Sequence, residues 1–282
     1  EPPLRIPDLP AGVALHRVEN AQRSPVFALN WAARELARGD LLLFAIDGAR
    51  IFSHRMFETM LKAHAALDGS FVYSLGWHIG PKLQHQSIVE GYNAAVEDAL
   101  IAGAGWPTRE DALFDISVFA GSSKKGHFNP IAESNAFSIS RSMFDRFGGY
   151  DERFRSPGGG LANLELFERY VTRRRARNIC LLSEGTFHQV HDSVSVSGDS
   201  KWSLLDGEYQ DIFGRSYKVP DYSCLYFGKP RPAVVPHLIG SLETLCPPVA
   251  DPSTDEKAMR KAHPLLRADY YRGLAKSLFG RR

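Results

Sequence analysis

A carboxylate at the end of an apolar segment is the first residue of this chain that could do chemistry. Asp47 follows the apolar run at 41–46 and precedes Gly48. A carboxylate in that position can bind a divalent cation that neutralises a diphosphate, and a glycine lets a ligand come close to the backbone. The same aspartate could instead cap the following turn. The sequence therefore predicts a cation site at Asp47 only if other residues complete it.

Two histidines near the end of a later apolar segment form a second candidate site. His188 and His191 belong to the motif Phe-His-Gln-Val-His at 187–191. Imidazole is a common ligand of divalent metals, but residues three apart on a strand face opposite sides. The two histidines could therefore share one ion only across a turn, and a pair of ordinary strand-end histidines is the alternative. A hydrolytic zinc site is not predicted, because the chain has no HExxH spacing.

Composition and charge exclude several classes of protein. The chain has 282 residues, of which 44% are hydrophobic and 23% charged, as in an ordinary globular protein. A net charge of +2 provides no broad cationic surface, so we expect no nucleic-acid partner. Cys180, Cys224 and Cys246 are far apart and form no CxxC pair, which favours a reducing compartment. No apolar run reaches the roughly 20 residues of a membrane span, so we expect a cytoplasmic protein without a transmembrane segment, with peripheral membrane association left open.

Alternating helix and strand patterns predict how these residues are positioned. The first half is expected to contain a strand at 13–18, a helix at 25–37, a strand at 41–46, a helix at 53–67, a strand at 71–75 and a helix at 87–102. The uninterrupted run at 41–46 is typical of a strand buried on both faces. The alternation predicts a doubly wound α/β sheet, in which ligands bind beyond the carboxyl ends of the strands. Asp47 would lie at one of those ends.

The second half adds further strands and helices around glycine-rich turns. Its expected elements are a strand at 135–139, a short helix at 141–147, a tight turn at 148–149, a glycine loop at 158–160, a helix at 161–174 and strands at 179–182 and 186–190. A helix near 202–213, a proline-rich crossing at 220–252 and a charged helix follow. We therefore expect a main domain at 1–200 and a C-terminal helical and proline-rich extension at 201–282 that packs on it.

The order of these motifs resembles that of the family 2 glycosyltransferases, which have the GT-A fold. In that family an Ala-Arg-Asn helix precedes an apolar strand that ends in a metal-binding DxD motif. An apolar strand, an arginine, a Gly-Gly-Phe-Asp-Glu turn and a helix opened by Glu-Asp then form the acceptor side. The matching segments here are Ala28-Leu29-Asn30, the strand ending at Asp47, Asn135 to Arg141, Gly148 to Phe154, and the glycine loop before the helix that carries Asn163 and Glu165. The resemblance runs from about residue 13 to residue 191.

The resemblance implies both a fold and a reaction. The implied fold is a GT-A-like, Rossmann-related mixed sheet flanked by helices. The implied reaction is an inverting transfer of a hexosyl unit from a nucleotide sugar, with a UDP-sugar favoured, to a hydroxyl of a glycan, lipid-linked or protein acceptor. Mn²⁺ or Mg²⁺ would be the cofactor, held by Asp47 with His188 and His191. The residues implied to contact the nucleotide sugar are Asn30, Asp47, Gly48, Arg50 and Arg141.

The chain departs from the family pattern at two motifs. It has Asp47-Gly48-Ala49 in place of DxD, and Ala162-Asn163 in place of Glu-Asp. An amide cannot accept a proton as a general base near neutral pH, so Asn163 cannot replace the catalytic aspartate directly. The carboxylates that remain as candidate bases are Glu165, Asp151 and Glu133.

These departures leave a second function open. The chain could be a non-catalytic glycosyltransferase-like module that binds a nucleotide or glycan within a larger protein. The family's first strand also has no counterpart in this sequence, which begins with Glu1-Pro2-Pro3. We attribute that gap to residues that precede Glu1.

Overall fold

The computed structural model describes residues 9–19, 21–46, 49–191 and 198–245. The chain forms two compact units, Glu1–Ser241 and Leu242–Arg282. The first unit contains the sheet and its helices, and the second contributes only the end of one helix to the described residues. Within these residues, no helix combines the length and the apolar character needed to cross a bilayer.

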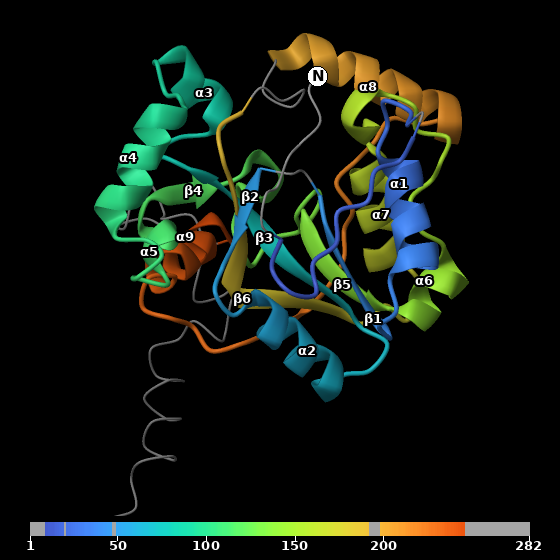
Figure 1. Ribbon diagram of the computed structural model, residues 1–282, viewed down its shortest axis with the longest axis horizontal. Helices are drawn as coiled ribbons and strands as arrows, with labels where there is room; N and C mark the ends of the chain where they lie inside the picture. Colours follow the sequence, from blue (N-terminus) through green and yellow to red (C-terminus); the bar gives the residue numbers. More distant parts are fainter. Residues whose placement is uncertain (1–8, 20, 47–48, 192–197, 246–282) are drawn as a thin grey trace, which may run out of the picture. The chain divides into compact units, whose positions relative to one another are not determined.

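The centre of the first unit is a mixed β-sheet (Figure 1). Its described strands are β1 (Leu41–Ala45), β2 (Arg50–Phe52), β3 (Phe71–Ile79), β4 (Ser117–Phe119), β5 (Ala136–Ser140), β6 (Asn178–His188) and β7 (Leu225–Phe227). The order is β1-β5-β3-β6-β2, with β4 beside β3 and β7 beside β6. The β3–β6 and β6–β7 pairs are parallel, and the other pairs are antiparallel. The predicted α/β class with a mixed sheet flanked by helices is therefore confirmed.

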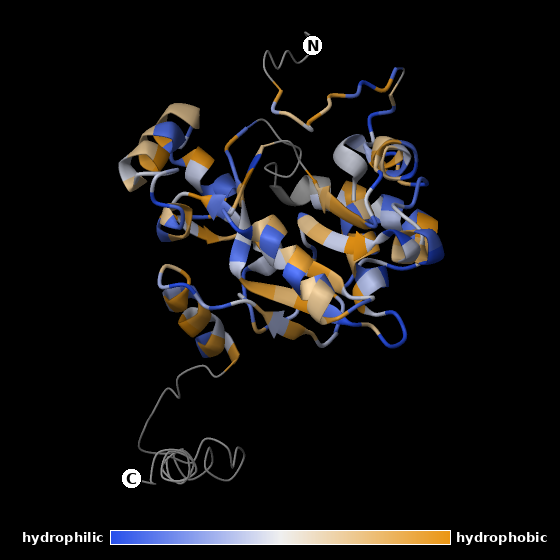
Figure 2. Ribbon diagram, turned by 60° about the horizontal axis from the view of Figure 1, so that its bottom comes forward, coloured by the Kyte–Doolittle hydropathy of each residue, from blue (hydrophilic) through white to orange (hydrophobic). Residues whose placement is uncertain are grey.

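Helices cover both faces of the sheet with apolar side chains. One face packs against α1 (Val26–Trp31), its continuation as a π-helix (Ala32–Leu36), α6 (Arg141–Phe147) and α7 (Ala162–Val171). The other face packs against α2 (Met56–Ala66) through Met56, Met60 and Ala63. Figure 2 shows hydrophobic residues concentrated in the strands between these helices.

A third buried cluster surrounds Trp77 at the far end of β3. It receives side chains from α4 (Ala94–Ala104), α5 (Ala112–Asp115) and α9 (Val235–Leu245). Trp77 is fully buried against Phe114 and Phe119, so it stabilises the core and cannot stack on a ligand. The remaining helices of the described residues are α3 (Gln84–Val89), α8 (Gly198–Phe213) and two short 3-10 helices, η2 (Gly121–Ser123) and η3 (Pro157–Gly159).

The prediction that the run at 41–46 is buried on both faces is wrong. Strand β1 is the end strand of the sheet and pairs with β5. Leu42 and Phe44 are buried under α1 and α6, whereas Leu43 is 39% exposed. An end strand that helices cover on one face needs an apolar residue only at alternate positions. Because Leu43, on the exposed face, is also apolar, the sequence does not reveal this alternation.

Two other local predictions also change. The segment 13–18 forms no strand, and Val13 and Leu15 are about half exposed. The helix expected at 87–102 is divided into α3 and α4 by a turn. Gly91 adopts a φ of +93° there, and the Asn93 side chain caps α4 by accepting hydrogen bonds from two backbone amides.

Residues 202–241 belong to the first unit and contribute to its core. Tyr209 of α8 and Tyr217 belong to the same buried cluster as Phe154 and Phe167. The boundary between the compact units lies after Ser241.

Candidate functional site

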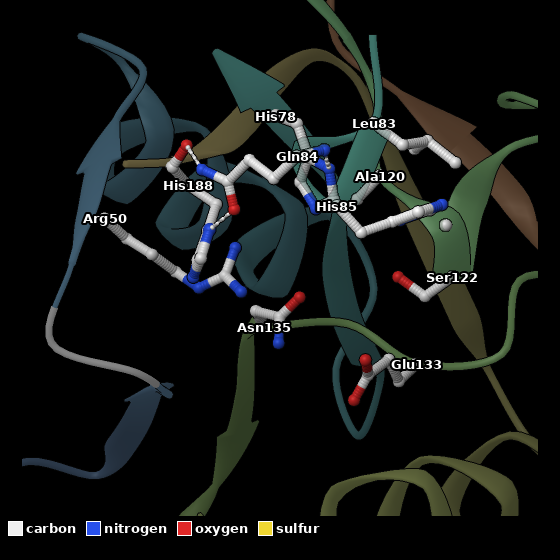
Figure 3. Close-up of a pocket in the computed structure, with 11 residues that line it drawn as sticks. Arg50, His78, Leu83, Gln84, His85, Ala120, Ser122, Glu133, Asn135 and His188 are labelled. Carbon is white, nitrogen blue, oxygen red and sulfur yellow. Dashed lines mark hydrogen bonds between the residues drawn. The ribbon is translucent and has the colours of Figure 1, made fainter. Parts of the chain in front are cut away.

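A polar cavity of about 200 Å³ lies where β3 and β6 end (Figure 3). Its lining residues come from the ends of β2, β3 and β6, from the starts of α3 and η2, and from the segments that connect these elements: Arg50, His78, Leu83, Gln84, His85, Ala120, Gly121, Ser122, Glu133, Asn135 and His188. The cavity therefore lies beyond the carboxyl ends of the parallel strands β3 and β6, which is where α/β proteins bind their ligands.

Strand register places three of these side chains next to one another. His188 ends β6, and its Cα partners are His78 on β3 and Arg50 on β2. Paired residues on neighbouring strands point to the same face, so one cationic group and two imidazoles line the same wall. Arg50 is held there because its Nε donates to the Ile46 carbonyl at 3.0 Å.

The side-chain amide of Asn163 is held beside the cavity by two hydrogen bonds that it donates. Asn163 is the second residue of α7, and its Nδ2 donates to Glu133 Oε2 at 2.6 Å and to the Ser134 carbonyl at 3.1 Å. Glu133 is half-buried at the cavity wall. The structure therefore brings together two of the four residues predicted to be catalytic, with the amide donating and the carboxylate facing the ligand space.

His188 and His191 meet across a turn, as their sequence spacing requires. Strand β6 ends at His188, and the two Nε2 atoms are 3.1 Å apart. The turn is held by the buried carboxylate of Glu97, whose two oxygens accept from the Val190 amide at 3.1 and 3.0 Å.

The spacing of these two imidazoles is compatible with a hydrogen bond between them and with two ligands of one divalent cation. Two nitrogens that each lie about 2.0–2.2 Å from one ion are separated by roughly 3.0–3.4 Å. Among the described residues, no group of three or more His, Cys, Asp or Glu side chains is arranged to hold a metal. Asp47 and Gly48, the other predicted residues of this site, lie outside the described residues.

The other predicted site residues hold the turn that follows α6 and do not line the cavity. Glu165 pairs with Arg169 at 2.7 Å, and Arg169 also donates to the Phe147 and Gly149 carbonyls at 2.6 Å. Asp151 pairs with Arg153, and hydrogen bonding to Arg153 holds the pKa of the Asp151 carboxyl below its ordinary value. Neither Glu165 nor Asp151 is therefore placed to act on a ligand in this cavity.

The remaining two residues also bind backbone groups. Asn30 accepts from the Tyr150 amide and donates to the Tyr150 carbonyl, both at 2.8 Å, which joins α1 to the turn. Arg141 donates to the carbonyls of Ala33, Ala37 and Gly39, and so fixes the end of the π-helix. Both residues are accounted for by the packing of the elements around the site.

His78 and Gln84 are functional candidates that lie outside the predicted set of site residues. His78 Nδ1 accepts from the backbone amide of Gln84 at 3.0 Å. Burial, together with the nearby His188 and Arg50, lowers the pKa of His78 to about 3, so the ring is neutral at physiological pH. Only the strand position of His78, at the end of a long apolar run, could have pointed to the site, and Gln84 gave no signal.

Comparisons with known proteins add no family to this description. No family model matches the chain, and no curated protein matches it either. Its function is therefore inferred from the residues of the cavity and from their arrangement.

Proposed function

We propose that this protein is a nucleotide-sugar-dependent glycosyltransferase with a GT-A-like fold, which transfers a hexosyl unit with inversion. One observation supports this function above all. The cavity is lined by a residue predicted to contact the donor, Arg50, by a candidate base, Glu133, and by a predicted cation ligand, His188. These three residues come from distant parts of the chain. A cationic group for a diphosphate and a carboxylate for a hydroxyl are what this reaction needs.

In the proposed reaction the acceptor hydroxyl oxygen forms a bond to the anomeric carbon of the donor. The bond between that carbon and the phosphate oxygen breaks, and its electron pair leaves with the nucleoside diphosphate. Glu133 accepts the hydroxyl proton, and Arg50 contacts the diphosphate. A divalent cation held by His188 and His191 with Asp47 would supply further positive charge to the leaving group.

Asn163 has a positioning role in this proposal. Its amide donates to Glu133 at 2.6 Å and orients the carboxylate toward the cavity. The base would thus be supplied by the loop before β5, next to the helix where the family has an aspartate. The adjacent, antiparallel strands β1 and β5 and the start of α7 beside the cavity are consistent with the GT-A-like arrangement.

Donor hydrolysis tests this proposal without knowledge of the acceptor. The protein would be incubated with a panel of nucleotide sugars and Mn²⁺, and release of the nucleoside diphosphate would be measured together with the donor Kd. We expect Glu133→Gln to abolish release with little change in Kd, and Arg50→Ala to raise the Kd. Glu58→Gln, which alters an exposed carboxylate of α2, is the matched control and should behave as the wild type.

Two outcomes would contradict the proposal. If no nucleotide sugar binds, the cavity serves another ligand. If a donor binds equally to the wild type and Glu133→Gln and neither releases diphosphate, the protein is the non-catalytic binding module.

A further inference from the structure

We infer that Gln84 is a positioning residue that imposes opposite tautomers on His78 and His188. Gln84 is the first residue of α3 and is buried beside both rings (Figure 3). Its backbone contacts one imidazole and its side chain contacts the other. The inference concerns the cavity of the proposed function, and its consequence for cation binding rests on that function.

The side chain of Gln84 determines the tautomer of His188. Gln84 Nε2 donates to the His188 carbonyl at 3.1 Å, and a carbonyl can only accept, so the orientation of the amide is fixed. The other amide atom, Oε1, then lies 2.5 Å from His188 Nδ1. Because Oε1 can only accept, Nδ1 carries the hydrogen. In the neutral ring the lone pair is therefore on Nε2, which faces His191 at 3.1 Å.

The backbone of Gln84 determines the tautomer of His78 in the opposite sense. The Gln84 amide lies 3.0 Å from His78 Nδ1, and a backbone amide can only donate. His78 Nδ1 therefore carries the lone pair, and the hydrogen of the neutral ring is on Nε2. One cavity histidine thus offers an N–H donor while its strand neighbour offers a lone pair.

The opposite tautomers of His78 and His188 suit the two roles of these residues in the proposed site, which are donation to a ligand and binding of a cation. A lone pair on His188 Nε2 is the form that ligates a cation, and a partner on the other ring nitrogen of a ligating histidine fixes its tautomer. An N–H on His78 Nε2 can donate to an oxygen of a bound ligand. Without the Gln84 side chain, His188 Nδ1 would lose the acceptor oxygen that holds its hydrogen.

Long-range ¹H–¹⁵N NMR spectra of the imidazoles near pH 7.5 report these tautomers directly. Signals would be assigned from the loss of peaks in His78→Gln and His188→Gln. We expect Nδ1–H for His188 and Nε2–H for His78 in the wild type. Gln84→Leu should change only His188, because the backbone amide that fixes His78 remains. Gln84→Glu loses the hydrogen bond to the His188 carbonyl but keeps an acceptor oxygen for Nδ1, so the Nδ1–H of His188 should persist. Ser87→Ala, a buried change in the same helix, should leave both patterns intact.

The affinity for Mn²⁺ alone is a second measurement, and it would not change if Gln84 had only a structural role. We expect Gln84→Leu to weaken Mn²⁺ about 10- to 100-fold and Gln84→Glu to retain it. An Nε2–H tautomer on His188 in the wild type, or an unchanged His188 pattern in a folded Gln84→Leu, would overturn the inference. If Gln84→Leu does not fold, the wild-type spectrum and Gln84→Glu decide the matter. Expected tautomers in a protein that binds no nucleotide sugar would support the assignment of Gln84 while refuting the proposed function.

Discussion

Asn163 and Glu133 form a hydrogen-bonded pair at the cavity, and in the proposed function this pair supplies the base and its positioning residue. Asn163 donates to both the Glu133 carboxylate and the Ser134 carbonyl. A carboxylate at position 163 would face two acceptors and donate to neither. The asparagine is therefore complementary to the glutamate that stands beside it, and the two residues have to be interpreted as a unit.

Asn163→Asp is expected to reduce donor hydrolysis, although it restores the aspartate of the family's Glu-Asp motif. Two carboxylates about 2.6 Å apart repel each other, which raises the pKa of the pair and keeps a proton on it. The basic form of Glu133 would then be reached only at higher pH. The acidic limb of the pH–rate profile should therefore lie at higher pH in the variant than in the wild type. A faster variant with an unchanged profile would show that residue 163 itself is the position of the base.

The sequence predicted this pair only incompletely, for a physical reason. Glu133, Asp151 and Glu165 were equivalent candidates, since each is a carboxylate near a predicted strand or helix end. Their difference is their position: Asp151 and Glu165 pair with Arg153 and Arg169 at residues that do not line the cavity, whereas Glu133 lies at the cavity wall beside the Asn163 amide. Such partners depend on tertiary contacts that local sequence patterns do not contain.

At the scale of elements, the turn after α6 depends on one ion pair, in which the carboxylate of Glu165 is buried and the guanidinium of Arg169 is partly exposed. Arg169 links Glu165, which is only 7% exposed, to two carbonyls of the turn. Arg169→Met would leave the Glu165 charge without its partner, and we expect a loss of about 3–5 kcal/mol in the free energy of unfolding. Urea denaturation measures this loss. Lys62→Met, which removes an exposed i,i+4 pair on α2, should cause no measurable change, and equal losses in the two variants would contradict the assigned role.

The same turn requires a glycine at its second position. A Cβ on Gly149 would lie 2.7 Å from the Phe144 ring and would overlap Asn30 Oδ1. We therefore expect Gly149→Ala to destabilise the protein by about 1–3 kcal/mol in thermal or urea unfolding. Gly103→Ala is the matched control, because nothing lies within 4 Å of a Cβ there and alanine favours the α4 helix by up to about 1 kcal/mol. A tolerated Gly149→Ala would mean that α1 and the turn are packed less closely than described.

For the whole molecule, the sequence predicted the α/β class but not the strand order. The cavity exists because β3 and β6 pair in parallel and β2 joins β6, which aligns His78, His188 and Arg50. These residues are up to 138 positions apart in the sequence, counted from Arg50 to His188. Hydrophobic periodicity indicates which segments are strands, but it does not specify their partners or register. The end position of β1 was missed for the same reason.

Stability of the whole fold should decrease on acidification through buried histidines. His127 lies among Trp77, Phe119 and Phe128, and burial lowers its pKa to about 4. The unfolded chain binds a proton near pH 6.5, above the folded pKa, so this stability is complete above about pH 6.5 and falls as the pH drops toward about 4. The decrease from this group is about 3 kcal/mol over that window.

His127→Phe removes this contribution while keeping an aromatic ring in the cluster. Urea unfolding free energies would be compared at pH 7.5 and pH 4.5 for both proteins. The variant should lose less stability between the two pH values than the wild type, because it lacks the His127 contribution. Some loss should remain in both proteins, since His64 and His78, whose pKa values are also lowered, are present in both. Identical losses would show that His127 is already protonated in the folded protein or is not buried in solution.

The most direct test of the central claim is a crystal structure with the nucleoside diphosphate of the tightest-binding donor and Mn²⁺. We predict that the diphosphate contacts Arg50, that the cation lies on His188 Nε2, and that Glu133 faces the space left for the sugar and acceptor. A diphosphate bound elsewhere, with the cavity between β3 and β6 occupied only by solvent, would contradict the proposed sugar transfer.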